Sequence, residues 1–341
     1  MPRPVSNPPN PWDSTAVEWL GPPPAAKLQV FEEEARSVVS KNDSPDLSFR
    51  FSANPYRGCQ HACAYCYARL YHQYLGFGAG TDFDTKIVVK TNAAACLRGE
   101  LRRPSWTGEP IVFSGATDCY QPLEASYRLT RACLKVCLAH ENPVAIITKS
   151  ALVRRDLDLL AELHARAGAS VFVSIPFANA AVGRAIEPAT PAPETRFQTL
   201  SALAEAGVPC GVSVAPMIPG LNDADVPAVL ERAAAAGASR AFLTLVRLPA
   251  EVEPVFLQRL EAAFPGRARA VLHAIEEMRG GRRYRSDFGE RMRGTGARWQ
   301  TVLDLFRVTC RRLGLRTGEG VEEFGRPRAT RRRPVQGELF P

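Results

Sequence analysis

The chain has 341 residues, of which 45% are hydrophobic and 23% charged. This composition is typical of a globular protein that buries a core, and the length fits one large or two modest domains. No apolar run reaches the about 18 residues of a membrane span. The N-terminus (MPRPVSNPPNPW) also lacks the apolar segment of a secretory signal. We therefore expect a cytoplasmic protein with no membrane partner.

The net charge of +8 is unevenly distributed along the chain. Residues 267–333 hold 18 Arg, no Lys and 8 acidic residues. A basic C-terminal region is typical of proteins that meet a polyanion, so we predict nucleic acid as a partner of this Arg-rich region. The alternative is a compositional bias of a GC-rich genome, since only 6 of the 43 basic residues are Lys.

Residues 1–45 form a Pro-rich leader, with eight prolines in residues 1–24. Proline fixes its own φ and has no amide donor, so we expect this leader to be largely disordered, with a short helix within residues 28–45. A barrel domain is predicted for residues 46–265. A helical, Arg-rich extension (266–318) and a basic, flexible tail (319–341) follow it.

Strands and helices alternate through the central domain. Five of the six predicted strands are almost continuously apolar, as in a parallel sheet buried on both faces. The strands are 47–52, 111–114, 144–148, 171–176, 211–216 and 242–248. The helices are 61–75, 123–140, 152–168, 194–207, 224–237 and 252–264, followed by 267–279 and 297–313 in the extension. Six such units predict an α/β fold, a partial (β/α)6 TIM-like barrel, with a doubly wound sheet as the alternative.

The segment NPYRGCQHACAYCYAR (54–69) holds three of the nine cysteines, Cys59, Cys63 and Cys66. An odd cysteine count in a reducing compartment indicates a metal or cluster site rather than disulfides. Three neighbouring thiolates can hold three corners of a [4Fe–4S] cubane and leave one iron open for chemistry. Two alternatives stay open: a zinc site completed by His61 and His72, and reduced core cysteines.

This segment, with Tyr65 directly before its third cysteine, resembles the radical S-adenosylmethionine (SAM) superfamily. Five later strings resemble an uncharacterised family of radical enzymes that is distantly related to spore photoproduct lyase, a DNA-repair enzyme. They are SGATDCYQPLE (114–124), TKSALVRRD (148–156), IEPATPAPETR (186–196), APMIPGLND (215–223) and RLP (247–249). The resemblance covers roughly residues 45–315.

The resemblance implies a [4Fe–4S] cluster whose open iron binds the amino and carboxylate groups of SAM. An electron from a reductant such as flavodoxin or ferredoxin would break the sulfonium C–S bond. The products would be methionine and a 5′-deoxyadenosyl radical that abstracts hydrogen from the substrate. DNA or a nucleotide-derived compound is the substrate class that we favour. The alternative is a protein without enzymatic activity, either an iron–sulfur redox protein or a binding protein associated with the DNA clamp.

Residues that follow the strands are further candidates, because chemistry in a (β/α) barrel lies at the carboxyl ends of its strands. The resemblance places Tyr65 near the adenine, and Thr117 or Asp118 at the α-ammonium of SAM. The other cofactor-binding candidates are Ser114, Gly115, Ser174, Met217 and Arg247. Lys149 closes an apolar run and is a candidate for an anion partner or a catalytic role.

Cys119 is a weaker candidate for a catalytic thiol. The resemblance aligns the hydrogen-donating cysteine of spore photoproduct lyase with Ala116 rather than with Cys119. The tail ends in a third kind of candidate: Gln336, Leu339 and Phe340 follow five Arg in residues 326–333. This string resembles the peptides that bacterial proteins insert into the DNA sliding clamp, and it predicts a clamp partner. The alternative is an inert chain end.

Overall fold

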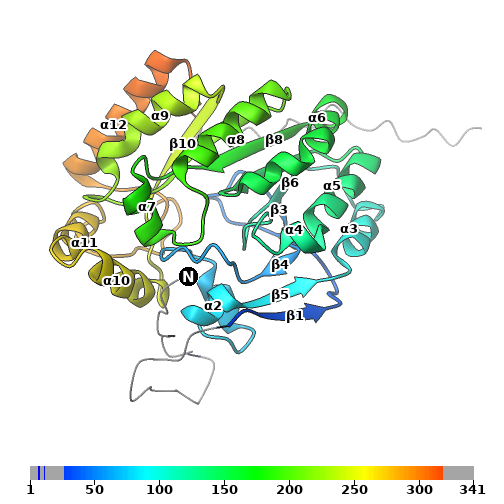
Figure 1. Ribbon diagram of the computed structural model, residues 1–341, viewed down its shortest axis with the longest axis horizontal. Helices are drawn as coiled ribbons and strands as arrows, with labels where there is room; N and C mark the ends of the chain where they lie inside the picture. Colours follow the sequence, from blue (N-terminus) through cyan, green and yellow to red (C-terminus); the bar gives the residue numbers. More distant parts are fainter. Residues whose placement is uncertain (1–6, 8–10, 12–26, 318–341) are drawn as a thin grey trace, which may run out of the picture.

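The computed structural model describes residues 27–317 together with residues 7 and 11 (Figure 1). Its centre is an eight-stranded sheet in the order β11-β10-β9-β8-β7-β6-β3-β2, parallel throughout except at the β2 edge. The strands are β2 (Val39–Lys41), β3 (Phe51–Ala53), β6 (Ile111–Phe113), β7 (Val144–Thr148), β8 (Ala169–Ser174), β9 (Cys210–Met217), β10 (Arg240–Leu245) and β11 (Arg316–Thr317). The predicted α/β fold with a partial TIM-like barrel is therefore confirmed.

The sheet is buried on both faces, as its apolar strands predict. On β6 the pleat turns Ile111 and Phe113 toward the helices, where they join the main core, while Val112 faces the opposite side. There Val112 packs with Phe172 of β8 and Phe242 of β10, whose ring centroids lie 5.1 Å apart. A small apolar cluster thus lies on one face of the sheet, and the large core lies under the helices on the other.

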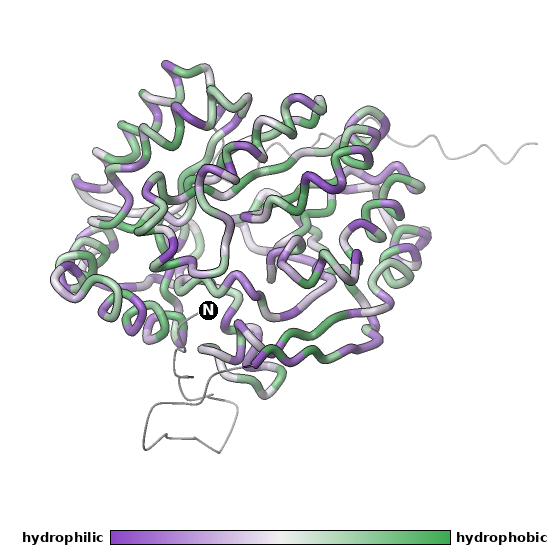
Figure 2. Tube along the Cα trace, in the orientation of Figure 1, coloured by the Kyte–Doolittle hydropathy of each residue, from purple (hydrophilic) through white to green (hydrophobic). Residues whose placement is uncertain are grey.

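Helices cover the outer face of the sheet (Figure 1), where their apolar residues join the main core, and hydrophilic and hydrophobic residues alternate along them (Figure 2). The helices along this face are α3 (Ala93–Leu101), α5 (Leu129–Ala139), α6 (Leu157–Arg166), α8 (Pro193–Glu205), α9 (Val226–Ala235) and α12 (Gly296–Leu313). The others are α1 (Arg69–Gln73), α2 (Thr81–Thr85), α4 (Glu124–Tyr127), α7 (Ala180–Ile186), α10 (Val252–Ala263) and α11 (Ala268–Glu277), with 3₁₀ turns η1 (Ala151–Asp156) and η2 (Asp223–Asp225). No described helix combines the length and hydropathy that a bilayer crossing requires.

Two predicted helices are interrupted where local backbone geometry overrides hydrophobic periodicity. The segment 123–140 divides into α4 and α5 because Arg128 adopts a left-handed conformation, with φ at 53°. The segment 61–75 is helical only from Arg69 to Gln73. Turns occupy the preceding residues, which hold the three cysteines.

The short helix predicted within residues 28–45 is wrong. Residues Gln29–Glu33 form β1, which pairs in parallel with β5 (Lys86–Lys90), and β5 also pairs with β4 (Tyr56–Arg57). These residues instead form the edge of a second, three-stranded sheet (Figure 1). The pairing joins segments about 57 residues apart, from Gln29 to Lys86. Tertiary pairing of this kind decides strand formation more than local propensity does.

Glycine substitutions test the packing of the sheet. A Cβ on Gly211 of β9 would lie 2.5 Å from Cε1 of Phe172 and 2.9 Å from the carbonyl oxygen of Arg240. Gly211→Ala should lower the free energy of unfolding by about 1–3 kcal/mol, because overpacking forces the sheet to shift. Gly99→Ala is the matched control: Gly99 lies in α3 with open space around it, so alanine should raise stability by up to about 1 kcal/mol. Urea titration measures both, and an undiminished stability of Gly211→Ala would contradict this packing.

Candidate active site

The three cysteines lie in one loop at the carboxyl end of the parallel strands. The loop follows β3, and the segments after β6 and β7 lie beside it. Asn54, directly after β3, accepts a hydrogen bond on Oδ1 from the amide of Ala116, after β6 (2.8 Å). The amide of Gln60 donates to Oε1 of Gln121 (3.1 Å), and Nε2 of Gln121 donates to the carbonyl oxygen of Gly58 (3.1 Å). The loop is therefore fixed directly to the next strand-end segment.

The backbone of the cysteine loop needs two left-handed residues. Gly58 has φ at +77°, and a Cβ there would lie 2.9 Å from the carbonyl oxygen of Lys86, so this position requires glycine. Ala62 has φ at 56°. The amide of Cys59 donates to the carbonyl oxygen of Phe83 (2.9 Å). These contacts fix the backbone of the loop that carries the three cysteines.

A fully buried arginine, Arg69, binds backbone carbonyl oxygens of the cysteine loop and of the segment before α2. Its Nε and Nη2 donate to the carbonyl oxygen of Cys63 (3.1 and 2.9 Å), and Nη1 donates to the carbonyl oxygens of Ala79 and Gly80 (both 2.8 Å). Nη2 also pairs with Oδ1 of Asp84 (2.8 Å). A planar guanidinium supplies five donors in a fixed fork, which lysine cannot reproduce. Arg69 therefore determines where the cysteine loop lies relative to α2.

The three thiols form a separate group from the other six. Cys59 and Cys63 are buried, Cys66 is partly buried, and the charges of Cys59 and Cys66 both act on Cys63. Burial raises the pKa of Cys63 well above its usual range and that of Cys66 to about 11. The remaining cysteines lie in or against the main core instead. Cluster binding must therefore displace protons from the thiols, and metal charge supplies that driving force.

This donor set fits a cubane cluster. Three thiolates would each bind a different iron, so they need not converge on one point, and the fourth iron would have no protein ligand. A single zinc ion needs ligands that do converge. Among the residues that the structure describes, no group of three or more His, Cys, Asp or Glu side chains could hold a single metal ion. The zinc alternative thus has no preformed site here.

The two histidines of the zinc alternative have other surroundings. Nδ1 of His61 lies 3.3 Å from Oδ2 of Asp118. Burial disfavours the imidazolium, but the negative charges of Cys59 and Asp118 outweigh burial and raise the pKa of His61 to about 10. His72 packs between the rings of Phe77 and Phe83, with centroids at 5.1 and 5.6 Å. Burial lowers its pKa to about 4.

Asp118 connects the segments that follow β3, β6 and β7. Besides His61, its carboxylate accepts hydrogen bonds from the hydroxyl of Thr148 (2.7 Å) and from the amides of Lys149 (2.8 Å) and Tyr120 (2.9 Å). Although burial raises the pKa of Asp118, His61 and these donors outweigh burial and bring it down to about 2. Asp118 is therefore a fixed negative charge beside the cysteine loop.

The other candidates after β6 lie in the same segment as Asp118. Ser114 has φ at 82°, and its Oγ accepts from the amide of Cys119 (3.0 Å). A Cβ on Gly115 would lie 2.9 Å from Oγ of Ser52, so glycine allows close approach of the two segments. The carbonyl oxygen of Gly115 accepts from the hydroxyl of Tyr67 (2.7 Å). The hydroxyl of Thr117 donates to the carbonyl oxygen of Tyr56 (3.3 Å).

Tyr65 and Lys149 meet over the cysteine loop. Nζ of Lys149 lies 5.7 Å from the ring centroid of Tyr65, and its positive charge acts on both Cys63 and Cys66. The hydroxyl of Tyr65 donates to the buried carboxylate of Glu187. Lys149 thus places a positive charge beside the cysteine loop.

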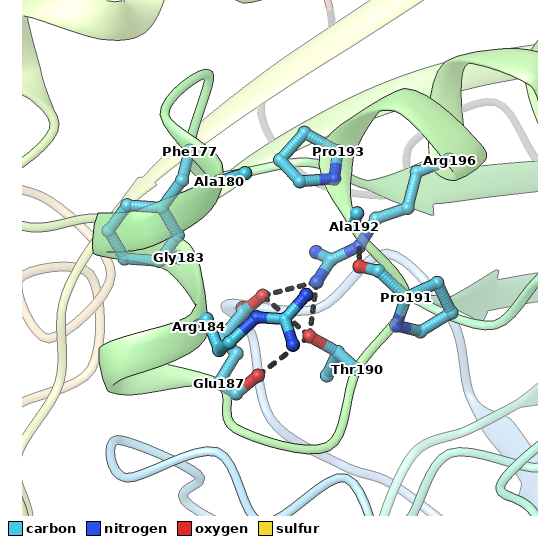
Figure 3. Close-up of a pocket in the computed structure, with 10 residues that line it drawn as sticks. All are labelled: Phe177, Ala180, Gly183, Arg184, Glu187, Thr190, Pro191, Ala192, Pro193 and Arg196. Atoms are coloured by element: carbon cyan, nitrogen blue, oxygen red, sulfur yellow. Dashed lines mark hydrogen bonds and ion pairs between the residues drawn. The ribbon is translucent and has the colours of Figure 1, made fainter.

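Glu187 and Arg196 form a buried ion pair that holds Tyr65 in place. Burial raises the pKa of Glu187, and the guanidinium of Arg196 opposes that shift. Figure 3 shows this pair with Thr190 beside a small pocket between α7 and α8, and Nη1 of Arg196 also donates to the carbonyl oxygen of Ser174 (2.9 Å). The amide of Ala64 donates to the carbonyl oxygen of Ile186 (3.0 Å). The α7–α8 segment therefore fixes both the cysteine loop and the end of β8.

The remaining candidates lie at other places. Ser174 ends β8 and is buried, and Met217 ends β9, fully buried in the main core. Arg247 follows β10 and is partly buried. Cys119 is fully buried in the main core, and burial raises its pKa well above the usual range. Their roles toward cofactor or substrate stay predictions, and Gln336, Leu339 and Phe340 lie outside the described residues.

Sequence reasoning missed the residues that hold the site together. The family-like strings contain Arg69, Gln121, Glu187 and Arg196, but the strings alone give these residues no structural role. Their partners are remote in sequence: Tyr65 and Glu187 are 122 residues apart. The only local signal was that charged residues stand in otherwise apolar or Pro-rich surroundings, which is costly unless they are paired.

Comparison with known proteins agrees with this geometry. The model of the Radical SAM superfamily matches residues 53–233. Uncharacterised proteins of Mycobacterium tuberculosis and Mycobacterium bovis are each 42% identical over 241 residues, covering 70% of this chain and 71% of theirs. An uncharacterised protein of Methanocaldococcus jannaschii is 29% identical over 202 residues, covering 59% of this chain and 72% of its own. Fold and site define a radical SAM enzyme.

The chain belongs to the radical SAM superfamily, whose members use a [4Fe–4S] cluster and SAM and need an external reductant. Among solved structures, spore photoproduct lyase in complex with a dinucleoside spore photoproduct has a TM-score of 0.61 at 18% identity. That similarity covers 84% of this chain and 81% of the lyase. At this identity it supports the shared fold alone.

Arg69→Lys tests the arginine under the loop. It keeps the charge that faces Asp84 but removes the fork that holds three carbonyl oxygens. We expect the free energy of unfolding to fall by about 1–3 kcal/mol, because buried acceptors lose their donors, and the iron bound per chain after reconstitution to fall with it. Arg57→Lys is the control, since Arg57 is exposed on β4. Full iron loading and unchanged stability of Arg69→Lys would show that the fork does not hold the loop.

Proposed function

We propose that this protein cleaves SAM reductively to a 5′-deoxyadenosyl radical, which abstracts hydrogen from a substrate derived from DNA or from a nucleotide. One observation carries the proposal: Cys59, Cys63 and Cys66 lie in one loop at the carboxyl end of the parallel strands, and the other cysteines of the described chain lie in or against the main core instead. When bound, the cluster and SAM supply the electron transfer and the radical chemistry.

The protein's own residues would bind the cluster and SAM, orient them and shield them from water. Cys59, Cys63 and Cys66 would hold three irons, and Arg69 keeps their loop in place. The loop is closed on one side by the buried His61–Asp118 pair. Lys149 and Tyr65 lie on another side, where a carboxylate and an adenine would find a cation and a ring. A largely buried site of this kind keeps water away from a reactive radical.

The roles of the strand-end residues in SAM binding belong to the same proposal. In this proposal Ser114, Gly115 and Thr117 face SAM from the segment after β6, which the missing Cβ of Gly115 allows to lie close to Ser52. Asp118 supplies negative charge on the side where the α-ammonium of SAM would lie. Ser174 and Met217 end β8 and β9, and Arg247 follows β10; in this proposal they extend the contact toward ribose, adenine and carboxylate.

The substrate class is supported by two observations of different kinds. The solved spore photoproduct lyase that shares this fold is in complex with a dinucleoside spore photoproduct. The extension of this chain, residues 267–317, is rich in Arg and packs against β10 through α12 and β11, and its Arg279 donates to the carbonyl oxygen of Val246, directly after β10. A basic element next to the carboxyl ends of the strands favours an anionic substrate. Flavodoxin or ferredoxin is the proposed reductant.

Single cysteine variants test the proposed function. Anaerobically reconstituted protein, reduced with dithionite, should convert SAM to 5′-deoxyadenosine and methionine. Cys59→Ala, Cys63→Ala and Cys66→Ala should each lose the cluster absorbance and form no deoxyadenosine, because each removes one of three iron ligands. Cys96→Ser is the control: Cys96 is partly buried outside the loop and donates only to the carbonyl oxygen of Ala35 (3.1 Å). Full iron loading of the wild type without deoxyadenosine would refute the proposal and favour a redox or binding protein.

A further inference from the structure

The segment between α11 and α12 is a loop of residues 279–294 whose two ends meet. The amide of Thr295 donates a hydrogen bond to the carbonyl oxygen of Met278 (2.7 Å), which closes the neck of the loop. Gly281 and Gly296 stand at the two ends with left-handed φ values of 83° and 82°. Surface loops with closed ends are frequently functional, and small residues at their ends often act as hinges.

One arm of this loop lies on the residues that follow β10. Nη2 of Arg279 donates to the carbonyl oxygen of Val246 (2.6 Å), the first residue after β10. Nη1 of Arg247 donates to Sδ of Met292 on the returning arm (3.2 Å). Val246 belongs to the buried apolar cluster that also contains Cys63. The loop therefore covers the strand end that packs beside the cysteine loop.

The tip of the loop reaches the segment that links β2 to β3. The amide of Gly289 donates to Oδ1 of Asp46 (2.6 Å), and Nε of Arg291 pairs with Oδ2 of the same carboxylate. Nη2 of Arg291 also donates to the hydroxyl of Ser44. The side chain of Asp46 is only 4% exposed, so this ion pair is largely shielded from water. The contact joins residues 245 positions apart in the chain.

These contacts span the open side of the partial barrel. In the eight-stranded sheet β10 lies next to one edge and β3 next to the other. Among the described residues, the edge strand β11 pairs only with β10 and the edge strand β2 only with β3, so the sheet does not close on itself. Two neighbouring residues of the loop, Arg291 and Met292, nevertheless contact Asp46 before β3 and Arg247 after β10. The loop therefore crosses the gap between the two edges.

The loop itself contributes little apolar surface to the fold. Among the described residues, no member of 279–294 belongs to a hydrophobic cluster, and Phe288 is 61% exposed. Its contacts with the barrel are polar. Thioether sulfur is a weak acceptor and carbonyl oxygens are uncharged, so the ion pair of Arg291 with Asp46 is the strongest of them. Segments with few buried apolar contacts open locally at a small cost in free energy.

The neck of the loop is held separately from its tip. Arg283 pairs with Glu253 of α10 and with Glu276 of α11 (both 2.8 Å). These two carboxylates lie on helices of the same side of the gap, next to the closed ends of the loop. Separation of the tip from Asp46 would therefore move the tip and leave the neck in place.

We propose that the 279–294 loop is a lid on the open side of the barrel and that Asp46 holds it closed through Arg291. The structure shows the closed state. Opening separates Arg291 from Asp46, and SAM and the substrate then enter beside the cysteine loop. This inference rests on the proposed function, because it places SAM and the substrate behind the loop. A lid that closes after entry keeps water away from the radical.

Hydrogen exchange of the reconstituted full-length protein, followed by mass spectrometry, tests the lid. Asp46→Asn should raise the exchange rate of the loop amides about 10-fold or more, because the open state loses its charged competitor, and should leave exchange in α11 and α12 unchanged. Asp43→Asn is the matched control. Asp43 lies in the same segment but is exposed and pairs with Lys41 (3.1 Å), so the same change of charge should leave the loop unaffected.

A second variant approaches the same pair from the loop. Arg291→Gln should also raise loop exchange, and the double variant Asp46→Asn/Arg291→Gln should exchange little faster than either single variant, because all three remove one interaction. Multiplied effects in the double variant would show that the two residues act separately. Wild-type loop exchange in Asp46→Asn, or equal increases in Asp46→Asn and Asp43→Asn, would likewise overturn the inference.

Binding kinetics of SAM separate a lid from a residue that contacts the ligand. Stopped-flow mixing of SAM with the reconstituted protein gives its association and dissociation rate constants. A lid that opens more often raises both constants by a similar factor in Asp46→Asn and leaves the Kd of SAM nearly unchanged. A changed Kd at an unchanged association rate would assign Asp46 to ligand binding. Unchanged rate constants in a variant whose loop exchanges faster would show that SAM does not pass this loop. Either result would overturn the lid.

The outcome is distinguishable from failure of the proposed function. Neither hydrogen exchange nor SAM binding requires turnover, whereas deoxyadenosine formation by the wild type reports on the proposed function alone. Deoxyadenosine formation together with wild-type loop exchange in Asp46→Asn would overturn the lid and leave the radical chemistry standing. Loop exchange and SAM kinetics that depend on Asp46, in a protein that forms no deoxyadenosine, would do the reverse.

Discussion

The site depends on the hydrogen bonds that Arg69 donates to the carbonyl oxygen of Cys63. A loop with two left-handed residues and three cysteines has little regular structure to hold it. The guanidinium replaces that structure with hydrogen bonds to three carbonyl oxygens and an ion pair to Asp84. A buried arginine without its partners is strongly unfavourable. We therefore expect the loop and the contacts of Arg69 to form together. The cysteines are thereby positioned before any metal binds.

Around this loop the sheet brings together segments that are far apart in the chain. Asp118 joins the ends of β6 and β7 to His61, and Glu187 joins the α7–α8 segment to Tyr65. Each of these carboxylates is buried and accepts several hydrogen bonds. The free-energy cost of burying its charge is small only when all these donors are in place, and that happens only in this one arrangement. Rigidity of the site thus follows from polar networks rather than from the helices, whose apolar faces stabilise the barrel behind it.

The sequence was sufficient to predict the barrel and the cluster ligands, because both signals are local. Buried parallel strands are short apolar runs, and Cys59, Cys63 and Cys66 lie within eight residues. The second sheet and the supports could not be predicted in this way. Strand β1 forms because β5 lies beside it, and Arg69, Glu187 and Arg279 find their partners only in the folded chain. Family-like strings marked most of these positions without giving the physical reason for them.

The central claim is that three thiolates hold a four-iron cluster and leave one iron free for SAM. Electron paramagnetic resonance of the reduced, reconstituted protein tests it most directly, because SAM bound to a free iron changes the electronic structure of the cluster. We expect the spectrum of a reduced [4Fe–4S] cluster whose g values shift when SAM is added. A spectrum of the same cluster that SAM leaves unchanged would show that the fourth iron is closed and would contradict the account.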